Sequence, residues 1–442
     1  MRYKKASLLL LLLILVFIAN NVKAQTCGFD ELYQKSRLDP SSKKQLMDIN
    51  AAIKAKVQGI RNGTVKRSVV PGTSMDATGA NMAQTANGWA YEVPVVVHII
   101  YDGATNSNNP TDAQIVKMIN DLNGVFSATK SNFASLTEGG VDIPIRFVLA
   151  KRDPNCNATN GILRVDGSVL PGYSDYGVKY GSATNGASHY DIKTLSRWPN
   201  KSYYNIWLVH KINPGNIAGF ASYPGTESIY DGTVVRTYYA TNGGSTLAHE
   251  LGHAMGLIHT FGDFGDGNDP CVAETDCTTE GDMVCDTEVS KGWPSCVAGA
   301  INPCTSAPYT GVQYNIMNYG PCSKNRFTAG QRDRAVAGLL TQRTSLLYSL
   351  GGKAPDAVPA LKPMDAPQTN LFPNQQGLNA GPITVEVGSL LFSSFGYDGD
   401  GMKDYLQQLC LAPIGKIPAA GAPLTVTIWG NRQYVKAWVD LT

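Results

Sequence analysis

The spacing of apolar residues predicts alternating helices and strands over the first half of the chain. A polar stretch with helical periodicity covers residues 46–57. Apolar, β-branched runs then predict strands at 93–101, 143–149 and 204–209, and a helix is expected after Thr111, a candidate N-cap. Strands interleaved with helices suggest an α/β arrangement for this part of the chain.

The N-terminus has the pattern of a secretory signal peptide. Arg2, Lys4 and Lys5 precede an apolar run from Leu8 to Ala19, and residues 22–24 offer small side chains at the spacing of a cleavage site. A membrane anchor is the alternative, but the run is shorter than the roughly 20 residues that span a bilayer. We therefore expect residues 1–24 to be removed and the mature protein to be secreted, without a membrane span.

Composition and charge narrow the class of protein further. The chain has 442 residues, of which 43% are hydrophobic, so it can bury a large core. The 37 basic and 35 acidic residues nearly balance and form no basic block, which argues against a nucleic-acid partner. Nine cysteines, six of them between Cys271 and Cys322, indicate disulfides and an oxidising compartment, although the sequence does not select their pairing.

The chemistry is carried by a predicted helix that begins near Ser245. His249 and His253 lie four residues apart, so both imidazoles can meet one Zn²⁺, and Glu250 follows the first ligand as a candidate general base. His259 would lie on the wrong side of a continuing helix, so Gly256 is the natural place for the chain to turn back. Three nitrogen ligands leave one position open, as in catalytic zinc sites.

This motif has two competing interpretations. A bare pair of histidines on a helix is often only a pair of polar residues, but the extended pattern fixes five positions in eleven and uses three of the six histidines. A purely structural zinc site would need a fourth Cys or His ligand nearby. The pattern therefore favours a catalytic site.

The zinc helix, read together with the segment Tyr314–Tyr319, resembles the metzincin metallopeptidases and, within them, the pappalysin family. The similarity extends over residues 91 to about 347 and includes the motifs at 161–164, 281–287 and 327–331. The resemblance implies an α+β fold. Its metzincin-type domain would have a mixed-sheet upper lobe, which holds the active-site helix, and an irregular lower lobe with disulfides. It also implies a secreted zinc endopeptidase that acts on proteins or peptides.

The resemblance assigns roles to further residues. Met317 would form the apolar floor under the histidines, and the hydroxyl of Tyr319 would bond to the zinc water or the oxyanion. Pappalysins also bind calcium, and Asp282, Asp286 and Thr287 match that segment, although solvated turn residues are an alternative explanation. The acidic residue that follows the tyrosine in members cleaving before Arg or Lys is absent here, and Glu288 replaces the family's proline.

Cys27 is the odd cysteine in a count of nine and stands just after the expected signal cleavage site. A thiolate is a good zinc ligand, and in some pappalysins a pro-segment cysteine fills the open zinc position and keeps the enzyme latent. The alternative is a disulfide between Cys27 and Cys156 or Cys410.

These observations divide the chain into four parts. Residues 25–88 are expected to form a pro-segment with a basic pair at 66–67, residues 89–350 the catalytic domain, and residues 351–442 a linker with a small β-rich module. In that module, Asp398, Asp400 and Asp404 resemble part of a calcium loop, but a plain turn explains them better.

The sequence predicts a secreted zinc endopeptidase made as a latent proenzyme, with Zn²⁺ and Ca²⁺ as cofactors. The alternative is a secreted binding or adhesion protein that keeps a metzincin fold without turnover; the intact Glu250 and Tyr319 favour the enzyme. Oligomeric state, physiological substrate and activator do not follow from the sequence.

Overall fold

The computed structural model describes residues 26–65, 73–76, 78–103, 108–226, 229–262, 271–272 and 274–355, and the backbone of three C-terminal strands. The expected signal peptide, the basic pair at 66–67, the acidic turn at 398–404 and Cys410 lie outside these residues.

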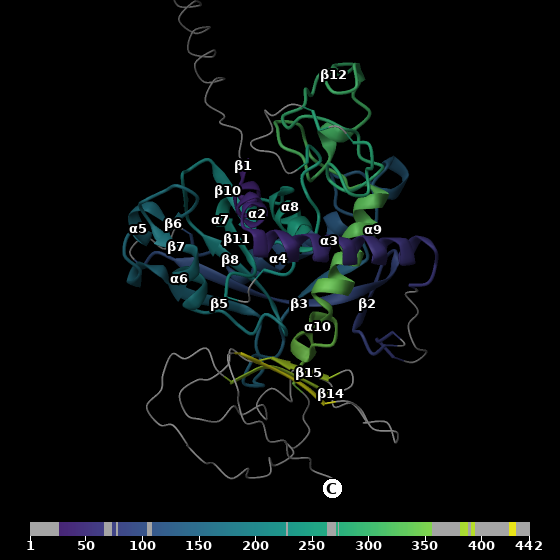
Figure 1. Ribbon diagram of the computed structural model, residues 1–442. Coiled ribbons are helices and arrows are strands. Elements are labelled where there is room, and N and C mark those ends of the chain that lie inside the picture. Colours follow the sequence, from purple (N-terminus) through teal and green to yellow (C-terminus); the bar gives the residue numbers. More distant parts are fainter. Residues whose placement is uncertain are drawn as a thin grey trace, which may run out of the picture.

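An eight-stranded mixed sheet forms the centre of the molecule (Figure 1). Its order is β1-β10-β11-β8-β3-β2, and β4 and β5 also pair with β3. The pairs β3–β4, β3–β5, β3–β8, β8–β11 and β1–β10 are parallel, whereas β2–β3 and β10–β11 are antiparallel. The strands are β1 (Thr26–Cys27), β2 (Met82–Thr85), β3 (Gly88–Tyr101), β4 (Ile145–Leu149), β5 (Ile162–Asp166), β8 (Tyr204–Val209), β10 (Ile217–Ala221) and β11 (Thr233–Arg236).

Smaller sheets complete the strand inventory of the described chain. They contain β6 (Val178–Lys179), β7 (Ala187–Ser188) and β9 (Ile212–Asn213), then the hairpin β12 (Ile301–Asn302) and β13 (Ala307–Pro308), and finally β14 (Gly381–Val387), β15 (Leu390–Ser393) and β16 (Leu424–Trp429). The strands predicted in the C-terminal part are therefore present, as β14 and β16.

The long strand β3 is buried on both faces, which explains its continuous apolar sequence. Val95, Val97 and Ile99 face the larger core, whereas Val96 and Ile100 belong to two smaller clusters. Side chains of a strand alternate between the two faces of a sheet, so one run of residues serves both layers. The strand predicted over 93–101 is thereby confirmed.

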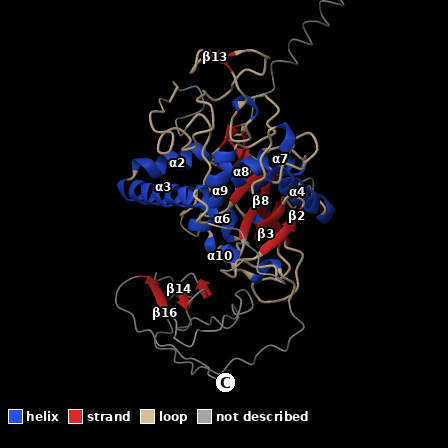
Figure 2. Cartoon of the chain, turned by 90° about the vertical axis from the view of Figure 1, so that its right-hand side faces the viewer, coloured by secondary structure: helices blue, strands red, loops and turns tan. Residues whose placement is uncertain are grey.

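Helices pack on the sheet and on one another, as seen from the side in Figure 2. Helix α4 begins with the predicted cap: the Thr111 side chain accepts from the backbone of Gln114, whose own side chain accepts from the Thr111 backbone. The helices are α2 (Phe29–Leu38), α3 (Pro40–Arg61), α4 (Asp112–Phe126), α5 (Tyr173–Tyr176), α6 (His189–Thr194), α7 (Thr237–Thr241), α8 (Thr246–Ala254), α9 (Ala329–Gln342) and α10 (Thr344–Leu347), with 3-10 turns at Leu136–Glu138, Gly167–Val169, Val312–Tyr314 and Leu350–Gly352.

The N-terminal segment, residues 26–65, is built into this architecture. Strand β1 extends the central sheet at β10, and helix α3 packs against α9. Ile53 is 0% exposed, and it belongs to a cluster that also contains Phe29, Tyr33 and Tyr223. The segment therefore shares a hydrophobic core with the rest of the chain.

Three disulfides hold the part of the described chain that follows helix α8, where regular structure is sparse. They join Cys271 to Cys304, Cys277 to Cys285 and Cys296 to Cys322. Cys156 is also disulfide-bonded, whereas Cys27 is free, so a bond between Cys27 and Cys156 is not formed.

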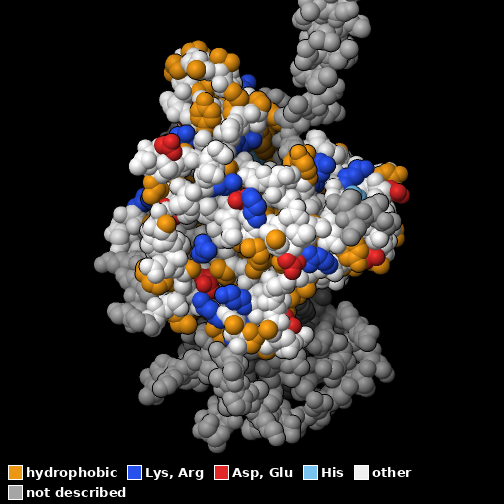
Figure 3. Space-filling model, turned by 180° about the vertical axis from the view of Figure 1, so that it is seen from behind, with side chains coloured by type: hydrophobic (Ala, Val, Ile, Leu, Met, Phe, Trp, Pro, Cys, Tyr) orange, Lys and Arg blue, Asp and Glu red, His pale blue; other side chains and the backbone are white. Residues whose placement is uncertain are grey.

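The surface of the described chain is mixed in charge and polarity. On the face seen in Figure 3, basic and acidic side chains are interspersed among apolar and neutral ones. Among the described residues, none of the helices has the length and apolar character needed to cross a bilayer.

Candidate active site

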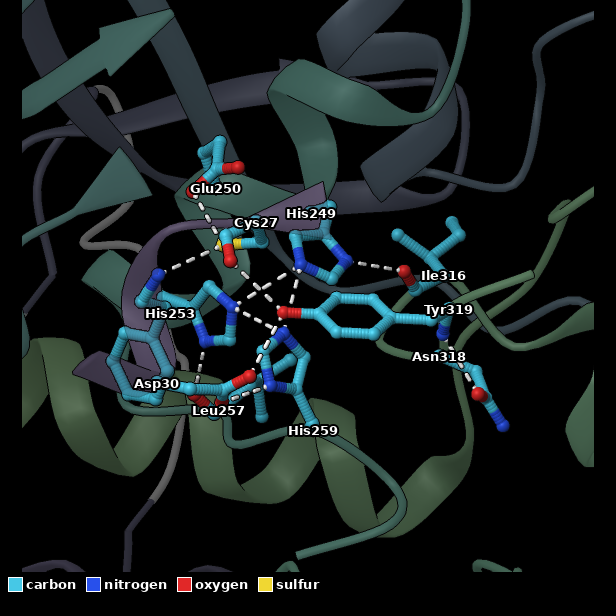
Figure 4. Close-up of polar contacts among 11 residues, drawn as sticks. Cys27, Asp30, His249, Glu250, His253, Leu257, His259, Ile316, Asn318 and Tyr319 are labelled. Atoms are coloured by element: carbon cyan, nitrogen blue, oxygen red, sulfur yellow. Dashed lines mark hydrogen bonds and ion pairs between the residues drawn. The ribbon is translucent and has the colours of Figure 1, made fainter. Parts of the chain in front are cut away.

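Helix α8 carries the first two histidines and ends where the sequence predicted. Gly256 has a φ of +94°, a conformation that favours glycine, and the N–H of Leu257 donates to the carbonyl of Gly252 at 2.9 Å. The chain then turns back toward the helix and brings His259 to the other two histidines (Figure 4).

The three imidazoles converge on one point. Their Nε2 atoms are 3.1 Å apart for His249 and His259, and 3.2 Å apart for His253 and each of the others. On the opposite edge of each ring, Nδ1 has an acceptor: the carbonyl of Ile316 at 2.7 Å, the carbonyl of Leu257 at 2.9 Å, and Oδ1 of Asp30 at 2.6 Å. Because Nδ1 carries the donated proton, the Nε2 lone pairs are left facing one another.

This donor set fits a zinc ion. Four ligands at about 2.0–2.1 Å in tetrahedral geometry lie roughly 3.3 Å from one another, close to the observed nitrogen separations. Burial and the neighbouring imidazoles lower the pKa of His249 and His253, so both rings are neutral, as metal ligands must be. Cys27 Sγ joins the group: its four ligand atoms lie within 4.8 Å of one another.

Glu250 is buried beside the histidines, one residue after His249. Burial raises the pKa of its carboxyl group to about 8, and the Cys27 thiol donates to its Oε2 at 3.3 Å. Strand β10 makes room for it at Gly219, where a Cβ atom would lie 3.1 Å from Glu250 Oε1.

Met317 lies against helix α8 at Gly252. Its side chain is 0% exposed, and its sulfur would lie 2.6 Å from a Cβ atom at Gly252 of α8. Asn315 fixes this turn, since its side-chain oxygen accepts from the backbone of Met317 at 2.9 Å. The absence of a side chain at Gly252 is therefore what lets the methionine approach the helix.

Tyr319 points from the same turn toward the histidines (Figure 4). Its hydroxyl lies 2.9 Å from Oδ2 of Asp30 and 3.0 Å from the carbonyl oxygen of Cys27. Burial, together with the negative charge of Asp30, raises the pKa of this phenol, so the hydroxyl keeps its proton.

The N-terminal segment thus supplies several residues to the site. The Phe29 ring stacks on His253 with centroids 3.8 Å apart and planes 4° from parallel. Burial and the nearby Glu250 and Asp30 raise the pKa of the Cys27 thiol; a divalent cation would act in the opposite direction. Sequence analysis found Cys27 but missed Phe29 and Asp30, which carry no motif and lie more than two hundred residues from their partners.

The residues predicted to bind calcium lie outside this cluster. They differ in whether their side-chain oxygens already have hydrogen-bond partners. Both carboxylate oxygens of Asp286 are taken by the start of α9: Oδ1 accepts from Thr328 at 2.7 Å and Oδ2 from the Gly330 backbone at 2.8 Å. The Thr287 hydroxyl lies 2.8 Å from Oδ1 of Asp282. Asp282 is 1% exposed, and its Oδ2 has no hydrogen-bond partner.

Comparisons with known proteins agree with this site. The sequence model of the Peptidase M43 family, described as pregnancy-associated plasma protein-A, matches residues 186–340. An extracellular metalloprotease of Arthroderma benhamiae is 29% identical over 240 residues, which cover 48% of this chain and 77% of the relative. One from Arthroderma gypseum is 27% identical over 252 residues, which cover 54% and 68%.

Among solved structures, a variant of promirolysin from Tannerella forsythia shares the fold. The TM-score is 0.52 at 24% sequence identity, and the match covers 75% of this chain and 100% of that chain. The mixed sheet, the helix with two histidines and the third histidine beyond its glycine define a metallopeptidase. Over residues 186–340, the chain matches the M43 peptidases, the pappalysin family.

Proposed function

We propose that this chain is an extracellular zinc endopeptidase whose N-terminal segment keeps it latent. The observation that carries the proposal is the convergence of three imidazole nitrogens, 3.1–3.2 Å apart, beside the buried carboxyl group of Glu250. Three disulfides and the extracellular relatives support action outside the cell.

The residues of the site have separate roles in this proposal. His249, His253 and His259 would hold zinc, which when bound polarises a peptide carbonyl and lowers the pKa of water toward about 7. Glu250 would take a proton from the attacking water and deliver it to the leaving amine. The Tyr319 hydroxyl, once free of Asp30, would donate a hydrogen bond to the oxyanion of the tetrahedral intermediate.

Latency would follow from the position of Cys27. Its sulfur lies with the three histidine nitrogens within 4.8 Å, so the thiolate would take the fourth ligand position and exclude water. Cys27 Sγ also lies 3.3 Å from Oε2 of Glu250, so Cys27 would block access to the general base as well. Removal of the N-terminal segment would free both groups.

Glu250 provides the test of catalysis. We expect Glu250→Ala to bind zinc in the same ratio as the wild type, by elemental analysis, because it is not a ligand. Its turnover of denatured casein, after removal of the N-terminal segment, should fall by roughly 10²- to 10⁴-fold. The wild type should lose activity with a zinc chelator and regain it with zinc. An inactive but zinc-loaded processed wild type would instead indicate a binding or adhesion protein.

We further propose that Asp282 belongs to a calcium site. Its Oδ2 is buried without a hydrogen-bond partner, and burial and the nearby Glu274 raise the pKa of Asp282, which a hard cation would reverse. Calcium should therefore raise the melting temperature of the wild type by several degrees. Asp282→Asn should abolish that increase, whereas Asp276→Asn, an exposed change in the same region, should retain it. Equal calcium responses in all three proteins would refute the assignment.

A further inference from the structure

The carboxylate of Asp30 is bound by two donors of the active site at once. Oδ1 lies 2.6 Å from Nδ1 of His259 and Oδ2 lies 2.9 Å from the Tyr319 hydroxyl (Figure 4). The His259 side chain is 0% exposed and that of Asp30 is 12% exposed, so the contact is shielded from water. Both distances are typical of strong hydrogen bonds to an ionised carboxylate.

The acceptors of His259 and Tyr319 belong to the N-terminal segment, whereas the acceptors of the other two histidines do not. His249 and His253 donate to the backbone carbonyls of Ile316 and Leu257, both of which lie outside the N-terminal segment. His259 donates to Asp30, and both neighbours of the Tyr319 hydroxyl, Asp30 and the Cys27 carbonyl, belong to the segment. When the segment leaves, two enclosed donors lose their acceptors together, which costs free energy until another acceptor replaces them.

The backbone of the segment holds Asp30 in this position through contacts in addition to those of the Cys27 thiol, which accepts from the N–H of Phe29 at 3.3 Å. Strand β1 pairs with β10, and the N–H of Gly28 donates to the carbonyl of Gly219 at 2.9 Å. Helix α2 then begins at Phe29, whose ring stacks on His253. Asp30 is the next residue, so its carboxylate has an anchor separate from Cys27.

We propose that Nδ1–H of His259 and the hydroxyl of Tyr319 form a subsite for one carboxylate. Asp30 fills it in the uncleaved chain and thereby acts as a second anchor of the N-terminal segment, and a carboxylate ligand fills it when Asp30 is absent. The inference rests on the proposed function for the idea that the segment is inhibitory, but the binding of the carboxylate does not require turnover.

The test uses the full-length chain and amide hydrogen exchange of residues 26–38, which reports opening of the segment without any need for activity. All variants carry Cys27→Ser, so that the thiol no longer holds the segment. Adding Asp30→Asn should speed exchange on the order of 10- to 100-fold, because two charge-assisted hydrogen bonds are weakened. Asp48→Asn removes an exposed carboxylate from the same segment and should leave exchange unchanged.

Chemical rescue then separates a carboxylate subsite from general packing. In the Cys27→Ser, Asp30→Ala double variant, acetate should slow the exchange again toward the Cys27→Ser rate, whereas chloride at equal ionic strength should not. Equal exchange rates for Asp30→Asn and Asp48→Asn, or no effect of acetate, would overturn the proposal. If the processed wild type has no peptidase activity, the proposed function fails, but the exchange and acetate results still decide the subsite.

Discussion

At the scale of single residues, the site depends on two glycines as much as on its polar side chains. Gly219 of β10 leaves the space that Glu250 fills, and Gly252 of α8 leaves the space that the Met317 sulfur fills. Neither glycine is needed for an unusual backbone angle, since neither has a positive φ. Each is there because a neighbouring atom comes too close for a Cβ atom.

Replacing Gly252 should therefore destabilise the protein, although alanine is the better helix former. The new methyl group would lie 2.6 Å from the Met317 sulfur, and such overpacking costs typically 1–3 kcal/mol, against a gain of about 1 kcal/mol in helix propensity. We expect Gly252→Ala to lower the free energy of unfolding by up to about 2 kcal/mol in urea titrations. Gly244→Ala, where a Cβ atom meets nothing within 4 Å, is the matched control. Equal stability of the two variants would contradict this account of the methionine turn.

At the scale of elements, the long apolar strand and the helices with strong end signals were predictable. β3 follows from its β-branched run, α4 from its capping residues, and α8 from the histidine spacing and its terminal glycine. The short strands β10 and β11 were not predicted. Their four or five residues, with a glycine inside β10, become strands only because they pair within the sheet.

The site residues, too, were predictable only where they lie close together in the sequence. The three histidines of the site and Glu250 lie close together in the sequence, so their spacing reflects their geometry. Asp30 and Phe29 meet His259 and His253 only through the folding of the whole chain, and an aspartate or phenylalanine near a cysteine has no distinctive pattern. The pairing of β1 with β10 is what brings them together, and it rests on two residues of strand.

His98 on β3 gives an element-level prediction about pH. Its side chain is buried, its Nε2 lies 2.9 Å from Oδ1 of Asn205, and its ring stacks on Trp207. Burial lowers the pKa of His98 to about 4. An unfolded histidine has a pKa of about 6.5, so the unfolded state binds a proton first as pH falls. Stability from His98 is therefore fully present above about pH 6.5 and is lost progressively down to about pH 4.

The measurement compares the wild type with His98→Gln, which keeps an amide donor for Asn205 but cannot titrate. Urea unfolding at pH 7.5 and pH 5 should show a loss of about 2 kcal/mol in the wild type beyond that in the variant, since each pKa unit is worth about 1.4 kcal/mol. Loss of zinc at low pH affects both proteins and cancels in the difference. Identical pH dependence of the two would show that His98 is not buried in its neutral form.

At the scale of the whole molecule, the N-terminal segment packs against the rest of the described chain in two places. On one side, β1 extends the central sheet and places Cys27, Phe29 and Asp30 in the site. On the other, α3 packs on α9, where Arg334 donates to Asn50 of the segment at 2.7 Å. Arg61, near the end of α3, reaches Asp333 at 3.1 Å. The contacts that Cys27, Phe29 and Asp30 make in the site are therefore supported by a helix that lies outside it.

A cut in the chain between residues 65 and 73 should consequently leave the segment bound. Phe29, Tyr33, Leu46, Ile49 and Ile53 are all buried, and each such side chain stabilises the complex by roughly 1.5–3 kcal/mol, before the cost of ordering. The nicked protein should elute as one species in gel filtration, remain inactive, and separate only when the segment is degraded or unfolded.

Ile53→Ala should weaken the association by about 2–5 kcal/mol, because Ile53 is 0% exposed. Met47→Ala on the same helix, where the side chain is 63% exposed, should leave it unchanged. If the segment dissociated at once on nicking in the wild type, activation would require one cut, and the packing of α3 on α9 would contribute nothing to latency.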